Sequence, residues 1–226
     1  VISSADLASA DAADGSMDGN IDLDLVAAQG GSYRFLGGAF DQELGFSVSS
    51  LGDIDGDGFD DLLIGSREAD IPGEPNDLGS AYVVSGGSLA NLDASDGSTD
   101  GIIDVVGSIG KPGITRFVGE DTDDNAGTGV SVVGDVDGEG DAEMLVGARE
   151  EEDGADGAGA AYLVSGRDLE TLDALDGASD GNIDLGLVAR VDDTIVVDVN
   201  ADGDGTVTGT YVTGTATVSS VEDFVA

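Results

Sequence analysis

The chain has 226 residues, which is enough for one sizeable domain or two small ones. Its formal charge is −41, from 7 basic and 48 acidic residues, and this imbalance argues against nucleic acid and anionic lipid as partners. Cysteine and histidine are both absent, which removes disulfides, thiolate metal sites and the commonest general base. The charge favours cations, a cation-bridged surface or another copy of the chain as partners, and a salt-adapted surface without specific ions is the alternative.

The composition favours many short strands and turns. The 38 glycines are costly inside helices and cheap in turns, and aromatic residues make up only 4%. No run of about 18 apolar residues is present, so we expect no membrane-spanning helix. The chain begins with Val1 and has no basic-then-apolar leader, which we interpret as a processed protein or an excised piece.

An acidic segment begins the chain and recurs twice. It is headed by Leu7, Leu89 and Leu169, and its first copy reads DAADGSMDGNID from residue 11. We predict an insertion rather than a strand. Its aspartates either form a further cation site or cap turns, and in the second case its leucines and isoleucines pack on a neighbouring sheet.

Matched strands follow the first two insertions, 82 residues apart. SYRFLGG around Arg34 corresponds to ITRFVGE around Arg116, and GFSVSSLGDIDGDGFDDLLIGS to GTGVSVVGDVDGEGDAEMLVGA, before GSAYVVSG or GAAYLVSG closes the unit. Short alternating runs between glycine and aspartate clusters are typical of strands, so each unit supplies about four strands, enough for one antiparallel sheet. The aromatic residues predicted to fill the core between sheets are Phe35, Phe46, Tyr82, Phe117 and Tyr162.

The stretch from Gly52 to Gly65, GDIDGDGFDDLLIG, carries the strongest functional signal. The side chains of Asp53, Asp55, Asp57 and Asp61 and the carbonyl of Phe59 offer the hard oxygens that Ca²⁺ takes, and their charge makes the loop costly to fold without a cation. A solvated acidic turn is the alternative. An EF-hand needs glutamate at the twelfth position, where this chain has Ile64, so we predict a calcium loop that begins a β-strand.

The sequence after the third insertion differs from the repeat. It is rich in valine and threonine, which favours two to four strands. A third, weaker cation loop is predicted there from Asp198, Asn200, Asp202 and Asp204.

Residues 45–85 and 127–165 resemble the FG-GAP repeat of integrin alpha-chain β-propellers and of many secreted bacterial proteins. The resemblance rests on Gly45-Phe46, the DxDGDG loop, the strand ending in Gly65 and the closing AYVVSG. It implies an all-β fold of tandem four-stranded antiparallel propeller-like blades, in which each loop binds Ca²⁺, with acidic loop insertions and a C-terminal β-rich segment. The predicted segments are 1–30 (end of a preceding blade and first insertion), 31–86 (first blade), 87–112 (second insertion), 113–166 (second blade), 167–190 (third insertion) and 191–226 (C-terminal β segment).

The resemblance also implies a second calcium site, with departures from the family pattern. Its ligands would be the side chains of Asp135, Asp137, Glu139 and Glu143 and the carbonyl of Asp141. Glutamates at two of these positions change the ring that surrounds the ion, so we expect weaker or altered binding there.

These observations predict a secreted, non-enzymatic, calcium-stabilised structural or adhesive protein of a bacterial or archaeal cell surface. Two blades cannot close a propeller, so the missing blades come from a longer chain or from other copies. We expect the N-terminal strand, Val1–Ser3, to complete a sheet in a neighbouring copy. The alternatives are a calcium-dependent module that binds a cell-surface or glycan ligand and a non-catalytic fragment of a larger secreted enzyme.

Overall fold

The computed structural model describes residues 7–18, 20–23, 32–38, 42–69, 77–136, 138, 140–149, 158–166, 169–175, 177–188, 198–199, 207–211 and 216–218. The chain divides into two units, Val1–Gly186 and Leu187–Ala226, and each is described by itself. Val1–Ser3, the predicted donor strand, lies outside the described residues. None of the described helices is long and apolar enough to cross a membrane.

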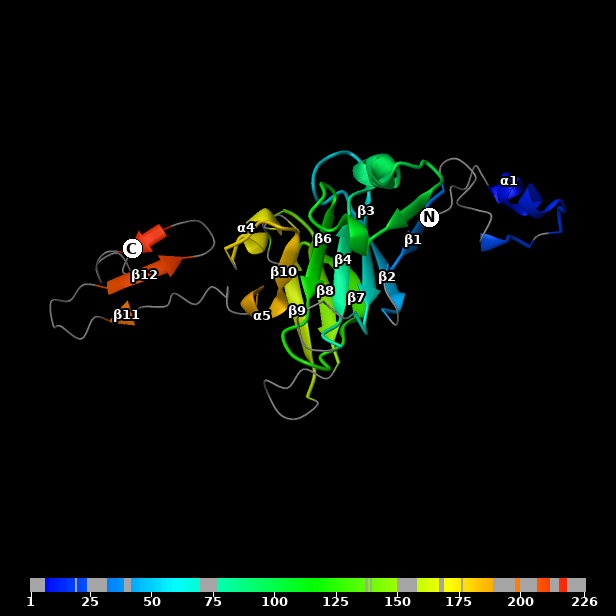
Figure 1. Ribbon diagram of the computed structural model, residues 1–226. Coiled ribbons are helices and arrows are strands. Elements are labelled where there is room, and N and C mark those ends of the chain that lie inside the picture. Colours follow the sequence, from blue (N-terminus) through cyan, green and yellow to red (C-terminus); the bar gives the residue numbers. More distant parts are fainter. Residues whose placement is uncertain are drawn as a thin grey trace. The chain divides into compact units, whose positions relative to one another are not determined.

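The first sheet of the larger unit has five strands in the order β10-β6-β4-β3-β2 (Figure 1). Strands β2, β3, β4 and β6 pair antiparallel with one another in that order, and β10 pairs parallel with β6. Their bounds are β2 Leu44–Gly52, β3 Asp61–Ser66, β4 Ser80–Val84, β6 Ile114–Val118 and β10 Asn182–Asp184.

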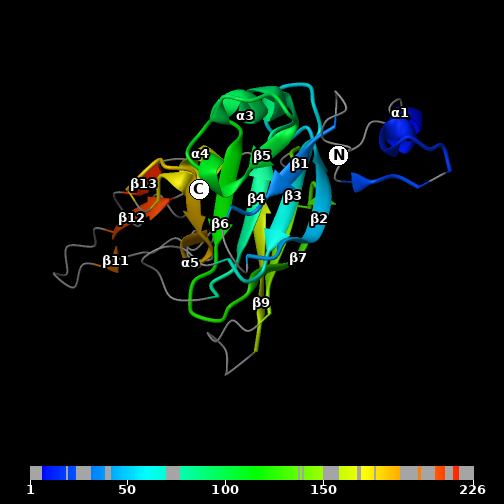
Figure 2. The same cartoon turned by 45° about the vertical axis from the view of Figure 1, so that its right-hand side comes forward.

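The second sheet is antiparallel, with the order β7-β8-β9, and β1 and β5 form a separate parallel pair (Figure 2). Each described helix is short, at most five residues long. The all-β prediction is therefore confirmed. The bounds are β1 Arg34–Leu36, β5 Ile102–Asp104, β7 Ala126–Gly134, β8 Glu143–Ala148 and β9 Ala160–Ser165 for strands, α1 Leu7–Asp11, α3 Leu89–Asp93, α4 Leu169–Asp173 and α5 Leu185–Val188 for α-helices, and η1 Ala12–Asp14, η2 Gly86–Ser88, η3 Ala94–Asp96 and η4 Val106–Ser108 for 3₁₀ helices.

Strand pairing crosses the predicted repeat boundary. Strand β6, predicted at the start of the second blade, pairs with β4 of the first sheet, with Tyr82 opposite Arg116. Strand β1 pairs with β5, and β6 pairs in the same way with β10. The second and third acidic segments therefore each contain a three-residue strand, and the prediction of an insertion without a strand is wrong there, because three residues are too few to show alternation.

The acidic segments also supply part of the core. Leu92, Ile103 and Val105 of the second segment are buried in one cluster with Tyr82 and Val84 of β4. The residues at the equivalent positions of the next repeat are buried as well, namely Leu172, Ile183, Leu185, Tyr162 and Val164. The leucines and isoleucines of these segments thus pack on the sheets, as one of the two readings predicted.

Aspartates of the acidic segments cap turns. Asp93 accepts a hydrogen bond from the Gly101 amide at 2.8 Å, and Asp173 accepts one from the Gly181 amide at 2.9 Å. Several others accept bonds from backbone amides two or three residues further on: Asp18, Asp96, Asp100, Asp104, Asp180 and Asp184. Such bonds are ordinary turn chemistry and favour the turn reading over a cation site.

The two sheets pack through β2 and β7. The Ser47 hydroxyl donates to the Gly127 carbonyl at 2.8 Å. A Cβ atom at Gly65 would lie 2.1 Å from that same carbonyl oxygen, so only glycine fits. Phe46, predicted as core, is instead 48% exposed beneath the Arg67 guanidinium, because it lies on the face of β2 opposite Ser47.

The smaller unit contains three antiparallel strands in the order β11-β12-β13. Their bounds are β11 Asp198–Val199, β12 Val207–Tyr211 and β13 Ala216–Val218. The predicted C-terminal β-rich segment is confirmed by these strands.

Candidate metal centre

The loop between β2 and β3 is shaped by glycine and by its own carboxylates. Gly56 and Gly58 have φ values of 76° and 90°, a left-handed conformation that favours glycine. The Asp57 amide donates to Asp55 at 3.0 Å, and the Gly58 amide donates to Asp53 at 3.0 Å. These bonds hold the carboxylates on the inner side of the turn.

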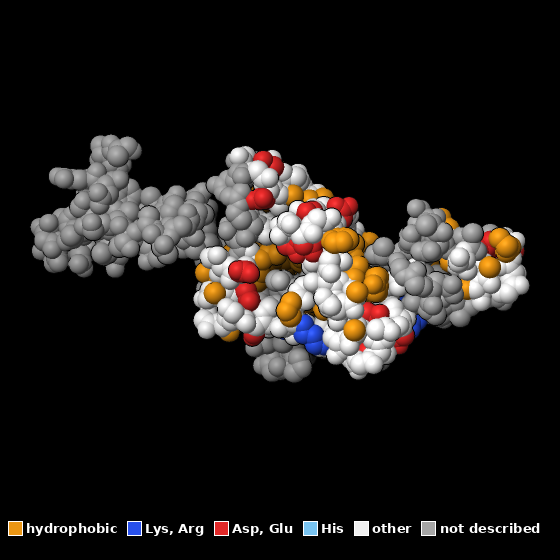
Figure 3. All heavy atoms as spheres, turned by 90° about the horizontal axis from the view of Figure 1, so that it is seen from above, with side chains coloured by type: hydrophobic (Ala, Val, Ile, Leu, Met, Phe, Trp, Pro, Cys, Tyr) orange, Lys and Arg blue, Asp and Glu red, His pale blue; other side chains and the backbone are white. Residues whose placement is uncertain are grey.

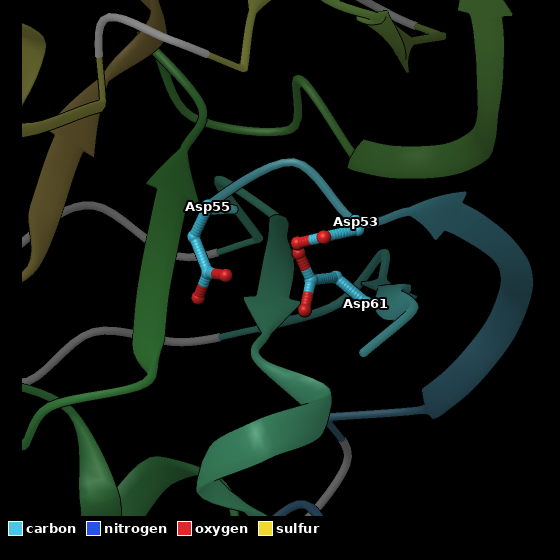
Figure 4. Close-up of side chains that lie close together, drawn as sticks. All are labelled: Asp53, Asp55 and Asp61. Atoms are coloured by element: carbon cyan, nitrogen blue, oxygen red, sulfur yellow. The ribbon is translucent and has the colours of Figure 1, made fainter. Parts of the chain in front are cut away.

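Three of the predicted carboxylates come together at this turn. Asp53, Asp55 and Asp61 each place one oxygen within 4.8 Å of the others, and Figure 4 shows Asp53 beside Asp61 with Asp55 across from them. Because Ca²⁺ binds oxygens at about 2.3–2.6 Å, two ligands of one ion are at most about 5 Å apart. The three side chains therefore fit a calcium ion.

Asp61 is the buried member of the group. It is fully buried, and it accepts hydrogen bonds from the Ile54 amide at 3.0 Å and the Gly86 amide at 2.9 Å. Burial raises the pKa of Asp61, the two amide bonds oppose this, and the neighbouring charges of Asp55 and Asp57 raise it further. A negative charge on Asp61 therefore has an energetic cost that a cation would offset.

Asp57 has a different environment from the other three. Its carboxylate accepts bonds from the Ser85 hydroxyl at 3.0 Å and the Phe59 amide at 2.8 Å, and it lies outside the group. The Phe59 side chain is 61% exposed. A Cβ atom at Gly87 would lie 2.0 Å from an Asp57 oxygen, so glycine gives this carboxylate its space. Asp57 therefore ties the loop to the end of β4.

Ser85 and Gly86 are partners of the loop that the sequence pattern did not predict. Ser85 binds Asp57, and the Gly86 amide binds Asp61 across 25 positions of sequence. The signal was present, because the closing motif AYVVSG ends on these two residues and recurs as AYLVSG in the second repeat.

The second predicted loop repeats part of this frame. The Val136 amide donates to Glu143 at 2.6 Å and the Gly140 amide to Asp135 at 3.1 Å, matching the bonds made to Asp61 and Asp53. Glu143 is buried like Asp61. However, the Gly166 amide donates to the Ala142 carbonyl at 3.3 Å, whereas the Gly86 amide donates to the Asp61 carboxylate.

The described residues of the second and third loops form no carboxylate group of the first kind. Asp141 lines the cavity described next, whereas Asp137 and Glu139 lie outside the described residues. In the third loop, Asp198 begins β11, and Asn200, Asp202 and Asp204 lie outside the described residues.

A cavity of about 450 Å³ adjoins the first loop. Asp55 and Asp61 line it together with Asp141 of the second loop and Glu170 of α4, and the apolar Val83 and Leu169 form other parts of its wall. On the face of the molecule in Figure 3, acidic side chains gather in several groups and basic ones are few. The carboxylate group therefore has an approach that attracts cations.

Residues 44–84 match the FG-GAP repeat family. This range runs from the start of β2 to the end of β4 and contains the whole carboxylate loop. The resemblance to the FG-GAP repeat is thereby confirmed for the first repeat, and such repeats are typical of extracellular proteins. No curated protein matches the chain.

Proposed function

We propose that the chain is an extracellular, calcium-stabilised β-repeat protein with a structural or adhesive role, and that it associates with copies of itself. The observation that carries the calcium part is Asp61, a fully buried carboxylate within 4.8 Å of two others. Among the described residues, no basic side chain lines the adjoining cavity, whose wall includes Asp55, Asp61, Asp141 and Glu170. A divalent cation would offset the negative charge that these side chains bring together.

In this proposal Asp53, Asp55 and Asp61 hold the ion. Calcium supplies positive charge that offsets the repulsion between the three carboxylates and the desolvation of Asp61. Asp61 also joins the β2–β3 turn to the end of β4 through Gly86. The site thus fixes the corner where three strands meet, and the proposal assigns it no catalytic role.

Thermal unfolding of the full chain tests the calcium proposal. The melting temperature should rise with Ca²⁺ and fall in chelator, and Mg²⁺ should restore less of it because its octahedral geometry suits this loop poorly. Calorimetric titration with CaCl₂ should give a dissociation constant of about 10⁻⁴–10⁻³ M, the range of extracellular modules. An equal melting temperature in Ca²⁺, chelator and Na⁺ of matched ionic strength would favour the salt-adapted alternative.

The cavity beside the carboxylates favours a second candidate, a calcium-dependent ligand-binding module. Its wall combines Asp55 and Asp61 with the apolar Val83 and Leu169, so a ligand with hydroxyl or carboxylate groups could complete the coordination of an ion there. This function requires binding to a glycan array in Ca²⁺ that is lost in chelator. If the array shows no such binding, the structural role remains.

A further inference from the structure

The first and second sheets pack face to face, and each has exposed residues on the side turned away from the other. One face of the first sheet is covered by β7, and its members are Ser47, Ser49, Leu63, Gly65, Ala81 and Val83. The equivalent residues of the second sheet, Gly129, Ser131, Leu145, Gly147, Ala161 and Leu163, form what we call the downstream face. Val83 is 6% exposed, whereas its equivalent Leu163 is 49% exposed, so the downstream face lacks the cover that the first sheet has.

Equivalent glycines of the two sheets show the same difference in cover. Gly65 is required because the Gly127 carbonyl lies 2.1 Å from where its Cβ would be. At its equivalent, Gly147, the nearest atom of the described residues to such a Cβ is 3.5 Å away, so no described backbone occupies the space that the Gly127 backbone takes beside Gly65. The downstream face therefore keeps the glycine that close approach of another strand requires.

The opposite end of the stack has the complementary feature. Gly45 is the equivalent of Gly127 and has a similar φ of 88°. No atom of the described residues lies within 4 Å of the position that a Cβ at Gly45 would take, whereas Gly127 packs against β3 and β4. Beside it, Phe46 and Val48 are 48% and 69% exposed. We call Gly45, Phe46, Val48 and Ser50 the upstream face.

Strand pairing is open at the same two ends. Among the described residues no strand pairs with the outer edge of β9, where the equivalent strand β4 has β6. Strand β1, the equivalent of β6, pairs with β5 on one side and with no β4-like strand in the described part of the chain. Residues 191–226 contain no further copy of the AYVVSG or AYLVSG motif.

We propose that the downstream face of one copy binds the upstream face of a second copy, repeating the contact between β2 and β7. Strand β1 of the second copy then adds antiparallel to β9, with Arg34 opposite Tyr162 as Arg116 is opposite Tyr82. This places the donor strand at β1 instead of Val1–Ser3. The contact is heterologous, so it closes into a ring, of about two to four copies for a propeller of four to eight sheets, or continues as a filament.

Two variants test the two faces separately. Gly147→Val blocks the downstream face, and Val48→Asp places a charge on the upstream face. Neither should disturb the folded monomer, because Gly147 has only ordinary contacts within its own chain and Val48 is 69% exposed. Met17→Asp, which adds the same charge at a residue 74% exposed and outside both faces, is the control.

The full chain in Ca²⁺ and physiological salt should show a concentration-dependent mass above the monomer in sedimentation velocity, and so should Met17→Asp. Each face variant alone should be monomeric with an unchanged melting temperature. An equimolar mixture of the two variants should stop at dimers, because each supplies one intact face.

A wild type that stays monomeric at every concentration overturns the contact, and so does a mixture that does not dimerise. A monomeric wild type whose melting temperature falls with Gly147→Val indicates that the chain's own residues cover the downstream face. The inference rests on the self-association in the proposed function but not on its calcium part, which fails separately if chelator leaves the melting temperature unchanged.

Discussion

The substitution Asp61→Asn tests whether the buried carboxylate is a calcium ligand. It keeps the size of the side chain and removes its charge. One of the two amides that now donate to Asp61, from Ile54 at 3.0 Å or Gly86 at 2.9 Å, would face the new NH₂ group. That lost bond costs about 1–3 kcal/mol, and relief of the buried charge offsets part of this cost in the ion-free protein.

The effect should be larger in Ca²⁺ than in chelator. A ligand present at 100 times its dissociation constant stabilises the folded state by about 2.7 kcal/mol. For a domain of this size, about 2–4 °C of melting temperature corresponds to each kcal/mol, so wild type should gain about 5–11 °C from Ca²⁺. Asp61→Asn should lose most of that gain, because only Asp53 and Asp55 of the group remain.

The control is Asp60→Asn, the same change at the exposed neighbouring aspartate. Differential scanning fluorimetry of the three proteins, with Ca²⁺ and with chelator, gives the difference of the two shifts directly. If Asp61→Asn keeps the full Ca²⁺ increment, or if Asp60→Asn loses as much of it, the assignment of Asp61 as a ligand is refuted.

Three further predictions follow from the same contacts. In chelator, the folded state should bind a proton at Asp61 more tightly than the unfolded state does, because the pKa of Asp61 is raised in the folded protein. The contribution of Asp61 to stability should therefore grow as pH falls through that pKa towards 3.8. In Ca²⁺, acid should instead destabilise the protein by releasing the ion, so the melting temperature plotted against pH should slope in opposite directions in the two buffers. Leu92→Ala should cost about 2–5 kcal/mol in denaturant unfolding, against less than about 0.5 kcal/mol for the exposed Asn91→Ala, and equal effects would contradict a core role for the acidic segment. Gly65→Val puts a Cβ 2.1 Å from a backbone oxygen of β7 and should cost about 1–3 kcal/mol or more by the same assay, while Gly147→Val should be near neutral.

The spacing of the repeats predicted more of the structure than any other feature of the sequence. It predicted which residues are equivalent, and equivalent pairs such as Tyr82 and Tyr162 are buried in both sheets. It also predicted the loop whose carboxylates come together at Asp53, Asp55 and Asp61. These features depend on local pattern, turn glycines and strand alternation, which a single sequence carries directly.

Features that depend on distant partners were not predicted. The strand Ile114–Val118 follows the second acidic segment. Its local pattern does not show whether it pairs with the strand before that segment, β4, or with the next strand along the chain, β7. The aspartates of the loop have the same local pattern, so the pattern does not show that Asp57 accepts the Ser85 hydroxyl and lies outside the group of Asp53, Asp55 and Asp61. Phe46 is a large apolar residue of the kind that fills cores, but it is 48% exposed on β2.

The position of the carboxylate group connects the proposed calcium binding to the proposed association. Strand β2 leads directly into the loop, and it carries Ser47 on the face that contacts β7 and Val48 on the upstream face. Asp61, at the start of β3, fixes where β2 ends by accepting the Ile54 amide. Without a cation, repulsion among the carboxylates acts on the strand that both sheet contacts need.

Calcium should therefore promote assembly through the position of β2 as well as by reducing the repulsion between two chains of charge −41. Raised NaCl, which screens charge without binding the loop, should reproduce only the second effect.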